Sequence, residues 1–330
     1  MAHGAGGDAM DRLIREIFRP AFSNEYLNRE NDQAIFNVAA GRMVMTTDSF
    51  IVSPLFFPGG DIGALAINGT VNDVALAGAR PTFISASFIL EEGLALVDLK
   101  RIVDSMSAAA RDAGVLVVAG DTKVVERGKA DGVFITTTGL GVVDHDFNLS
   151  ADMAQPGDLI ILSGSLGDHG MAILSTRESL SFESEITSDQ ACLHELIALM
   201  IAGGGDAIRI MRDPTRGGLA SALNEIAQQS KVGMRISETA LAVKPAVAAA
   251  CEILGFDPLY VANEGKLVAI CAPGAAETVL AAMRAHPLGH DAAVIGEVIR
   301  DDQCLVQLVT AFGGSRIIDR LSGEQLPRIC

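Results

Sequence analysis

Residues 144–157, Asp-His-Asp-Phe-Asn-Leu-Ser-Ala-Asp-Met-Ala-Gln-Pro-Gly, divide the chain into two halves that both mix helix and strand. The run is polar and ends in a Pro-Gly turn signal, which is typical of a boundary between domains. Neither half shows the strict strand-helix alternation of a doubly wound sheet. The chain is therefore predicted to be α+β, with a sheet-and-helix domain in residues 1–150 and an α+β sandwich domain in residues 151–310.

Apolar periodicity predicts where the helices and strands lie. Before the boundary we expect strands at 42–52, 82–90, 115–120 and 133–143 and helices at 8–19, 61–77 and 95–112. Pro20 is expected to end the first helix. After the boundary we expect strands at 158–163, 232–237, 266–271, 292–298 and 304–309 and helices at 167–176, 190–202, 217–229, 245–254 and 274–285. Residues 311–330 show little periodicity, and we interpret them as a flexible tail.

The acidic composition limits the classes of partner. The chain has 25 Lys and Arg against 41 Asp and Glu, a formal charge of −16. Nucleic acid is excluded as a partner by this balance, because duplex binding depends on Lys and Arg that replace phosphate counterions. A small anion can still bind if metal ions and backbone amides supply the positive field.

The cysteines and the N-terminal sequence indicate the compartment. The five cysteines are widely spaced and form no CxxC pair, so neither a disulfide framework nor a zinc knuckle is expected. The first residues lack the basic and apolar regions of a signal peptide. No apolar run approaches the roughly 18 residues of a membrane helix. We therefore expect a cytoplasmic protein without a membrane segment.

Glycines near the N-terminus are a candidate site for a phosphate. His3-Gly-Ala-Gly-Gly-Asp8 precedes a predicted helix, where backbone N–H groups can approach an anion. The pattern is neither a Walker A loop nor a GxGxxG motif after a strand. Taken alone, it is more often a terminal segment with a helix cap.

Four aspartates beside predicted element ends form a candidate metal site. They are Asp48, Asp61, Asp73 and Asp121. Each alone is more often a cap or turn residue. Their repetition in one acidic domain favours Mg²⁺, which takes oxygen ligands and is usually shared with substrate phosphates. Bound Mg²⁺ would also allow ATP to bind a protein of this charge.

Eight motifs are spread along the chain from its first residues to its last. They are His3-Gly-Ala-Gly-Gly, Asn68-Gly-Thr-Val-Asn-Asp-Val-Ala, Gly78-Ala-Arg-Pro, Gly120-Asp-Thr-Lys-Val-Val, Ser163-Gly-Ser-Leu-Gly-Asp-His-Gly, Asp213-Pro-Thr-Arg-Gly-Gly-Leu, Asn263-Glu-Gly-Lys and Pro327-Arg-Ile-Cys. Together they resemble one family, the HypE family of hydrogenase maturation proteins, and the terminal Pro-Arg-Ile-Cys is the most specific part of the match. The family belongs to a superfamily with aminoimidazole ribonucleotide synthetase, selenophosphate synthetase and thiamine-monophosphate kinase.

The resemblance implies an activity and a set of partners. It implies a homodimer that pairs through the sheets of its N-terminal domains and holds ATP and Mg²⁺. HypF would place a carbamoyl group on the C-terminal thiol, and ATP would drive its dehydration to a thiocyanate. The cyano group would then pass to iron on a HypC–HypD complex, for the active site of [NiFe]-hydrogenase.

The resemblance also implies site residues. The nucleotide would be bound by His3, Gly4, Gly6, Gly7, Thr47, Asn68 and Asn72. The catalytic residues would be Cys330, Lys123 and Glu264. Lys123 could steady negative charge on oxygen or phosphate, and Glu264 could accept an N–H proton. Without the resemblance, Lys123 could equally be an ion-pair partner of Asp121, and Glu264 a partner of Lys266 or a turn residue.

Cys330 could serve as a carrier thiol because it ends the chain. The 20 residues before the end could extend at most about 65 Å at ~3.3 Å each, enough to reach a partner's site. The adjacent α-carboxylate disfavours the thiolate and Arg328 favours it. Arg216 could bind phosphate or form an ion pair. His169 and His194 are expected to be ordinary core or surface residues, and the other four cysteines to be packing residues.

Three other functions remain as alternatives. A selenophosphate synthetase would be expected to carry a reactive Cys or selenocysteine near its N-terminus, and no cysteine precedes Cys192. The activity of a thiamine-monophosphate kinase would not explain the terminal Pro-Arg-Ile-Cys. A non-catalytic thiol carrier would need no nucleotide site, so the glycine segment, the aspartates and Lys123 argue against it.

Overall fold

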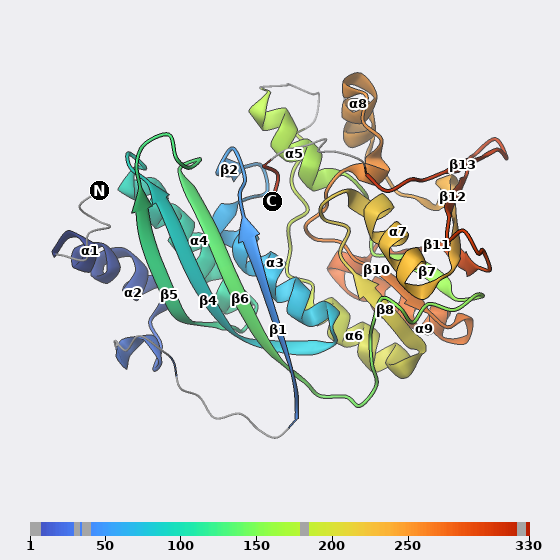
Figure 1. Cartoon of the computed structure of the whole chain (residues 1–330), viewed down its shortest axis with the longest axis horizontal. Helices are drawn as coiled ribbons and strands as arrows, with labels where there is room; N and C mark the ends of the chain where they lie inside the picture. The colour runs from blue at the N-terminus through green and yellow to red at the C-terminus, as the bar shows by residue number, and fades with distance from the viewer. Residues whose placement is uncertain (1–7, 30–33, 35–40, 179–184, 322–327) are drawn as a thin grey trace.

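The protein folds into two domains that lie side by side in the computed structural model (Figure 1). The structure describes residues 8–29, 34, 41–178, 185–321 and 328–330. The first domain is built on a four-stranded sheet and the second on a seven-stranded sheet. Segment 144–157 connects them. The two-domain α+β class follows from these two separate mixed sheets.

The first sheet has the strand order β1-β6-β4-β5. The strands are β1 (Arg42–Phe50), β6 (Val133–Val143), β4 (Ala79–Glu91) and β5 (Leu116–Val125), and only the β4–β5 pair is parallel. Helices α3 (Ile62–Leu76) and α4 (Leu96–Asp112) cover one face of it (Figure 1). A short hairpin, β2 (Phe56–Phe57) and β3 (Gly60–Asp61), precedes α3.

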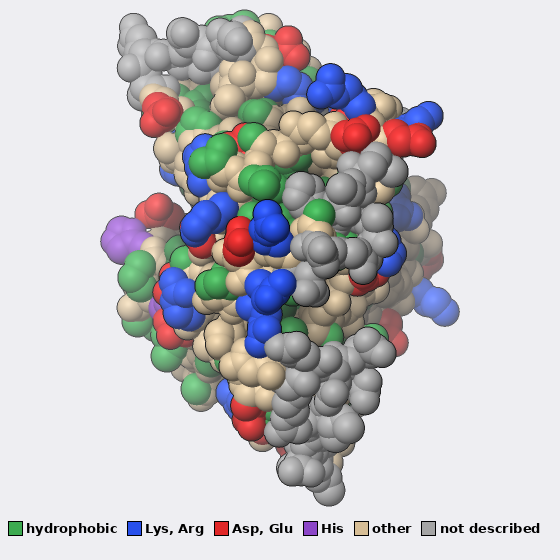
Figure 2. Space-filling model, turned by 90° about the vertical axis from the view of Figure 1, so that its left-hand side faces the viewer, with side chains coloured by type: hydrophobic (Ala, Val, Ile, Leu, Met, Phe, Trp, Pro, Cys, Tyr) green, Lys and Arg blue, Asp and Glu red, His purple; other side chains and the backbone are tan. Residues whose placement is uncertain are grey.

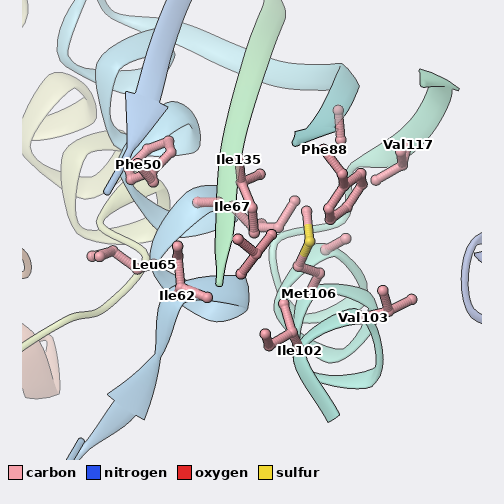
Figure 3. Packing of buried hydrophobic residues seen from close by; sticks show 14 of the residues in the cluster. Phe50, Ile62, Leu65, Ile67, Phe88, Ile102, Val103, Met106, Val117 and Ile135 are labelled. Atoms are coloured by element: carbon pink, nitrogen blue, oxygen red, sulfur yellow. The ribbon is translucent and has the colours of Figure 1, made fainter. Parts of the chain in front are cut away.

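Apolar side chains from both helices and all four strands, with Phe50 from β1 and Phe88 from β4 among them, form the core of this domain (Figure 3). On α4, Leu99, Ile102, Val103 and Met106 are buried, which confirms the predicted helical face. α3 is apolar on all sides because it lies between the sheet and the second domain. Each fully buried aliphatic side chain contributes about 1.5–3 kcal/mol through removal from water.

The opposite side of this sheet, which we call the outer face, is covered by no helix among the described residues, and only the Tyr26 ring packs on it, edge-on against Phe83 at 5.5 Å. Several of its apolar side chains are exposed, with Met45 at 72% and Leu116 at 41%. Ser49 and Thr136 lie beside them in adjacent strands and share a hydrogen bond of 2.9 Å. The outer face therefore presents exposed apolar side chains together with hydroxyl groups.

The second sheet has helices on both faces, as the predicted sandwich requires. Its order is β13-β12-β9-β11-β7-β10-β8. Helix α7 (Gly218–Ser230) packs on one face, and α6 (His194–Gly204) and α9 (Ala276–Arg284) pack on the other. The strands are β7 (Leu159–Leu162), β8 (Ile208–Arg212), β9 (Gly233–Ser237), β10 (Val268–Cys271), β11 (Ala293–Ile299), β12 (Val306–Val309) and β13 (Ser315–Ile317). Helices α5 (Asp168–Arg177) and α8 (Pro245–Leu254) flank this layer.

Residues 311–320 do not belong to a tail. β13 pairs with β12, Ile318 is fully buried and its N–H donates to the Val306 carbonyl at 2.8 Å. The turn between the strands contains Gly313 and Gly314, so the glycines that suggested a tail instead form a hairpin. β8 was also missed, although it reads Ile-Arg-Ile-Met-Arg, an alternating strand pattern.

Two element ends in the first domain differ from the prediction. The first helix does not stop at Pro20, because α1 (Asp8–Leu13), a π-helical segment (Ile14–Phe18) and α2 (Arg19–Phe22) follow without a break. Pro20 lies in the first turn of α2, where a missing N–H is tolerated. β5 continues to Val125, so Asp121 lies inside the strand and not at its end.

Within the residues that the structure describes, no helix is long and apolar enough to cross a bilayer.

Candidate active site

The last residues of the chain pair with the segment that follows β1. Ile329 forms an antiparallel bridge with Val52, and the Ile51 N–H donates to the Cys330 carbonyl at 3.2 Å. The Ile329 side chain is 5% exposed and packs in the core of the first domain. The C-terminus lies beside β2 in Figure 1. Cys330 is thereby seated against the first domain.

The thiol of Cys330 lies among acidic groups at the edge of a cavity of about 530 Å³. Burial, followed by the nearby charge of Glu264, raises the pKa of this thiol far above its ordinary value. Arg216 opposes that shift and lies 3.5 Å from Asp48. In this seated position Cys330 is a neutral thiol, so Arg328 does not make it a thiolate as the sequence left open.

Glu264 is buried beside the thiol, with 4% of its surface exposed. Its N–H donates to Asp189 at 3.2 Å, and Lys266 pairs with Asp189 at 3.1 Å, not with Glu264. A side chain at Gly265 would collide with the Asp189 carbonyl, so glycine allows this close approach. The Glu264 Oε1 atom is buried and has no hydrogen-bond partner among the described residues. It is therefore free to bind a further group.

Burial, and after it repulsion among neighbouring carboxylates, raises the pKa of the acidic groups around Glu264. Burial first, then Asp213 and Asp189, raise the pKa of Glu264 well above its ordinary value. Burial and then Asp73 raise the pKa of Asp213 to about 7. Burial also raises the pKa of Asp73, against a 2.9 Å hydrogen bond from Thr46. A cation or an acquired proton would relieve this repulsion.

The structure brings Asp48 and Asp73 into this group but gives Asp61 a different contact. Asp61 Oδ1 accepts the Gly63 and Ala64 N–H groups at 2.7 and 3.1 Å, so Asp61 is the N-cap of α3. In the described part of the chain, no three His, Cys, Asp or Glu side chains converge closely enough to hold a metal ion. Bound Mg²⁺ would therefore need further oxygen ligands, such as those of a nucleotide.

Asn72 connects α3 to the second domain. Its side-chain amide donates to the carbonyls of Ala191 at 2.9 Å and Glu264 at 3.3 Å, and its oxygen accepts the Leu193 N–H at 2.7 Å. These contacts use the polar atoms that we expected to bind a nucleotide. The structure thus shows Asn72 as a clamp that holds the Glu264 backbone in place.

Asn72→Ala is expected to lower the free energy of unfolding by about 1–3 kcal/mol, because buried backbone groups lose their partner. Urea unfolding followed by circular dichroism measures this loss. Asn68→Ala is the matched control, since Asn68 lies half-buried one turn earlier on the same helix. Equal midpoints for the two variants would contradict the clamp.

The strand register places Asp121 far from Asp48. The row of paired residues that starts at Asp48 on β1 continues through Thr137 and Ala86 to Gly120 on β5. Because Thr137 and Ala86 are buried, Asp48 lies on the helix-covered face and Asp121 on the outer face. β1 and β5 are opposite edge strands, about 14 Å apart at three strand spacings.

Lys123 lies with Asp121 on the outer face and forms an ion pair with it at 3.4 Å. Both side chains are mostly exposed, so the pair contributes only about 0–1 kcal/mol to stability. Lys123 is therefore available to a ligand, but within one protomer it is not beside Cys330. Thr47 also lies on this face, where its hydroxyl donates to the Thr137 carbonyl at 3.0 Å.

A cavity of about 620 Å³ lies next to Asp121, between the N-terminal helices and β5. Its wall is largely apolar, with Phe18, Phe88 and Val117, and Arg15 and Arg19 also line it. Lys and Arg side chains gather near the middle of the side of the molecule that carries α1 and β5 (Figure 2). His3, Gly4, Gly6 and Gly7 lie outside the described residues.

Two residues near the site were not identified from sequence as functional. Asp213 stands in Asp213-Pro-Thr-Arg-Gly-Gly, a polar segment directly after the missed strand β8. His169, judged ordinary, is fully buried and contacts the backbone of Ile329. The available signal was a titratable residue in a polar motif that contains glycines, Gly167-Asp-His-Gly and Asp213-Pro-Thr-Arg-Gly-Gly.

Comparison with known proteins identifies the family. Residues 30–143 match the N-terminal domain model of AIR synthase related proteins, and residues 155–308 match the C-terminal domain model. Carbamoyl dehydratase HypE of Bradyrhizobium diazoefficiens is 64% identical, over 100% of this chain and 95% of that protein. The chain belongs to the HypE family. Carbamoyl dehydratase HypE of Escherichia coli is 47% identical, over 100% of this chain and 98% of that protein.

Solved structures agree with this membership. A crystal structure of HypE in complex with ATP superposes with a TM-score of 0.96 at 49% identity, covering 100% of this chain and 99% of that chain. HypE in a HypE–HypF complex gives a TM-score of 0.82 at 51% identity, covering 94% of this chain and 99% of that chain. The predicted family, the enzyme class and the two-domain α+β fold are confirmed.

Proposed function

We propose that this chain uses ATP to dehydrate an S-carbamoyl group on its own Cys330 to a thiocyanate. This reaction would supply cyanide ligands for the iron of [NiFe]-hydrogenase. The observation that carries the proposal is the seating of Cys330 beside buried Glu264, which has an unpartnered oxygen. Relatives named carbamoyl dehydratase support it at up to 64% identity over the full chain.

The chemistry removes one oxygen and two protons from the thiocarbamate. The carbonyl oxygen attacks the γ-phosphorus of ATP and releases ADP. Loss of the two N–H protons and departure of the oxygen as phosphate then leave the carbon–nitrogen triple bond. Glu264 accepts an N–H proton, and its raised pKa suits it to this role. Lys123 stabilises negative charge on the transferring phosphoryl group.

The cavity beside β5 is the candidate pocket for the nucleotide base. An adenine ring would pack on its apolar wall, and the phosphates would extend past Asp121 toward the outer face. Mg²⁺ would be held by phosphate oxygens together with Asp48, Asp73 or Asp121, and Asp61 keeps its second oxygen for such a contact. The donor set fits, because the repulsion around Asp73 and Asp213 favours a cation. Bound Mg²⁺ supplies charge neutralisation for phosphoryl transfer.

A homodimer would bring the two halves of the site together. In one protomer the nucleotide cavity lies at edge strand β5 and Cys330 lies near edge strand β1. The exposed apolar side chains of the outer face suit a contact between two copies, which is what the family resemblance implied. Pairing of these faces would place one protomer's Lys123 near its partner's Cys330.

Two further partners complete the proposal. HypF would deliver the carbamoyl group, and the solved HypE–HypF complex supports a contact of this kind. A HypC–HypD complex would accept the cyano group. Delivery and acceptance would both require Cys330 to leave its seat, because there the residue is only partly exposed and lies at the edge of a cavity.

Intact-mass measurement tests the activity. The chain carbamoylated at Cys330 by HypF is incubated with MgATP, and the expected result is loss of one water together with formation of ADP. An unchanged adduct would favour the carrier function instead. A chain that lacks Cys330 is the control, and it should accept no carbamoyl group while it keeps its fold and nucleotide binding.

A further inference from the structure

His169 joins the interior of the second domain to the end of the chain. It stands at the start of α5 and is fully buried. Its Nε2 lies 2.7 Å from the carbonyl oxygen of Ile329, the residue before Cys330, and its Nδ1 lies 2.7 Å from the Ser188 hydroxyl. The Phe57 ring packs edge-on against the imidazole at 5.6 Å. The imidazole is thus held on two sides and presents one nitrogen to the terminal strand.

The partners of His169 determine its tautomer. A carbonyl oxygen only accepts hydrogen bonds, so Nε2 must carry a proton. Nδ1 is then the acceptor of the Ser188 hydroxyl, whose oxygen in turn accepts the Gln190 N–H at 3.1 Å. Burial lowers the pKa of His169, which keeps the imidazole neutral as this chain of hydrogen bonds requires.

We infer that His169 is the positioning residue that seats the C-terminal strand, so that Cys330 lies beside Glu264 for dehydration. Because His169 contacts the Ile329 backbone, it fixes the position of the terminal strand and does not recognise the side chain of residue 329. The inference rests on the proposed function for its catalytic consequence, whereas the seating of the thiol can be measured separately.

Two other side-chain contacts of the terminal strand lie nearer the solvent. Arg177 donates to the Arg328 carbonyl at 2.7 Å, and Arg328 pairs with Asp131 through two contacts of 3.0 Å. The Arg328 side chain is 55% exposed. Water can replace these contacts, but a buried carbonyl that loses the His169 proton has no such substitute. Among the polar side-chain contacts, the bond to His169 should therefore contribute most to the seating, in addition to the burial of the Ile329 side chain and the backbone bonds to Ile51 and Ser53.

Alkylation of Cys330 by iodoacetamide measures the seating directly. In His169→Leu we expect the alkylation rate of Cys330 to rise about tenfold, because one buried hydrogen bond is lost. His169→Gln keeps an N–H donor on a side chain of similar reach and should remain within about twofold of the wild type, since the lost bond is restored. Cys304, half-buried in the second domain, is the internal control and should be alkylated at an unchanged rate. Mass spectrometry of the two cysteine peptides separates the signals.

Dehydration of the carbamoylated chain should slow in His169→Leu and recover in His169→Gln. The inference is overturned if Cys330 alkylation in His169→Leu stays within twofold of the wild type, if Cys304 alkylation rises in parallel, or if Gln behaves like Leu. Should His169→Leu not fold, Ser188→Ala replaces it. Without the Ser188 hydroxyl the imidazole proton is no longer held on Nε2, so the bond to the Ile329 carbonyl weakens and Cys330 alkylation should also rise. If the wild-type chain does not dehydrate the adduct, the proposed function fails while the alkylation rates still test the seating.

Discussion

Glu264→Gln is expected to slow dehydration of the S-carbamoyl group by about 10²–10⁴-fold, the usual contribution of a positioned proton acceptor. Glutamine has nearly the same shape but cannot accept the N–H proton. The Glu264 side chain is buried and its Oε1 has no hydrogen-bond partner among the described residues, so the substitution breaks no contact of that atom. The carbamoyl adduct on Cys330 should persist in MgATP, as seen by intact mass.

The pH dependence provides a second readout for the same substitution. Because the pKa of Glu264 is raised, the wild-type rate should increase with pH through that raised value, and the variant should lack this increase. A carboxyl with a raised pKa contributes stability below its unfolded pKa and loses it as pH rises through the folded value. Glu264→Gln should therefore gain thermal stability relative to the wild type as pH rises.

Glu195→Gln is the matched control for this test. Glu195 is 71% exposed on α6, and its replacement should leave the dehydration rate unchanged. A rate for Glu264→Gln within threefold of the wild type would exclude Glu264 as the proton acceptor.

Lys123→Ala and Cys330→Ala are each expected to abolish thiocyanate formation, yet a mixture of the two should recover it. In a mixed dimer, the Lys123→Ala protomer supplies Cys330 and its partner supplies Lys123, so one complete site is restored. Random pairing of two chains makes half of the dimers mixed, each with one competent site of two, so about a quarter of the wild-type rate should return. Co-expressed chains with different affinity tags allow the mixed dimer to be isolated and assayed.

The reason for this expectation is the strand register. Asp121 and Lys123 lie on the outer face of edge strand β5, whereas Cys330 lies near β1 at the other edge. If the mixed dimer is as inactive as either parent, Lys123 acts on Cys330 within its own chain and the shared site is wrong. Activity of Lys123→Ala by itself would instead remove Lys123 from the mechanism.

Local sequence patterns predicted most of the fold. Leu99, Ile102, Val103 and Met106 recur with the helical period, and α4 buries all four. β6 runs from Val133 to Val143, within the predicted bounds. Errors arose where a polar residue, a proline or a pair of glycines was taken as the end of an element. Gly120-Asp-Thr-Lys alternates as a strand does, and one face of this strand simply remains exposed.

The sequence by itself determined the family, the two domains, and the residue types that the chemistry needs, because motifs and periodicity are local properties of the chain. Only the tertiary structure decided which of those residues meet. Asp48 and Asp121 seemed equivalent, but the sheet order and the two-residue period of a strand put them on opposite edges and faces. His169 and Ile329, 160 residues apart, meet because α5 packs beside the segment that holds the terminal strand. Such contacts depend on how separate elements pack, which no local pattern records.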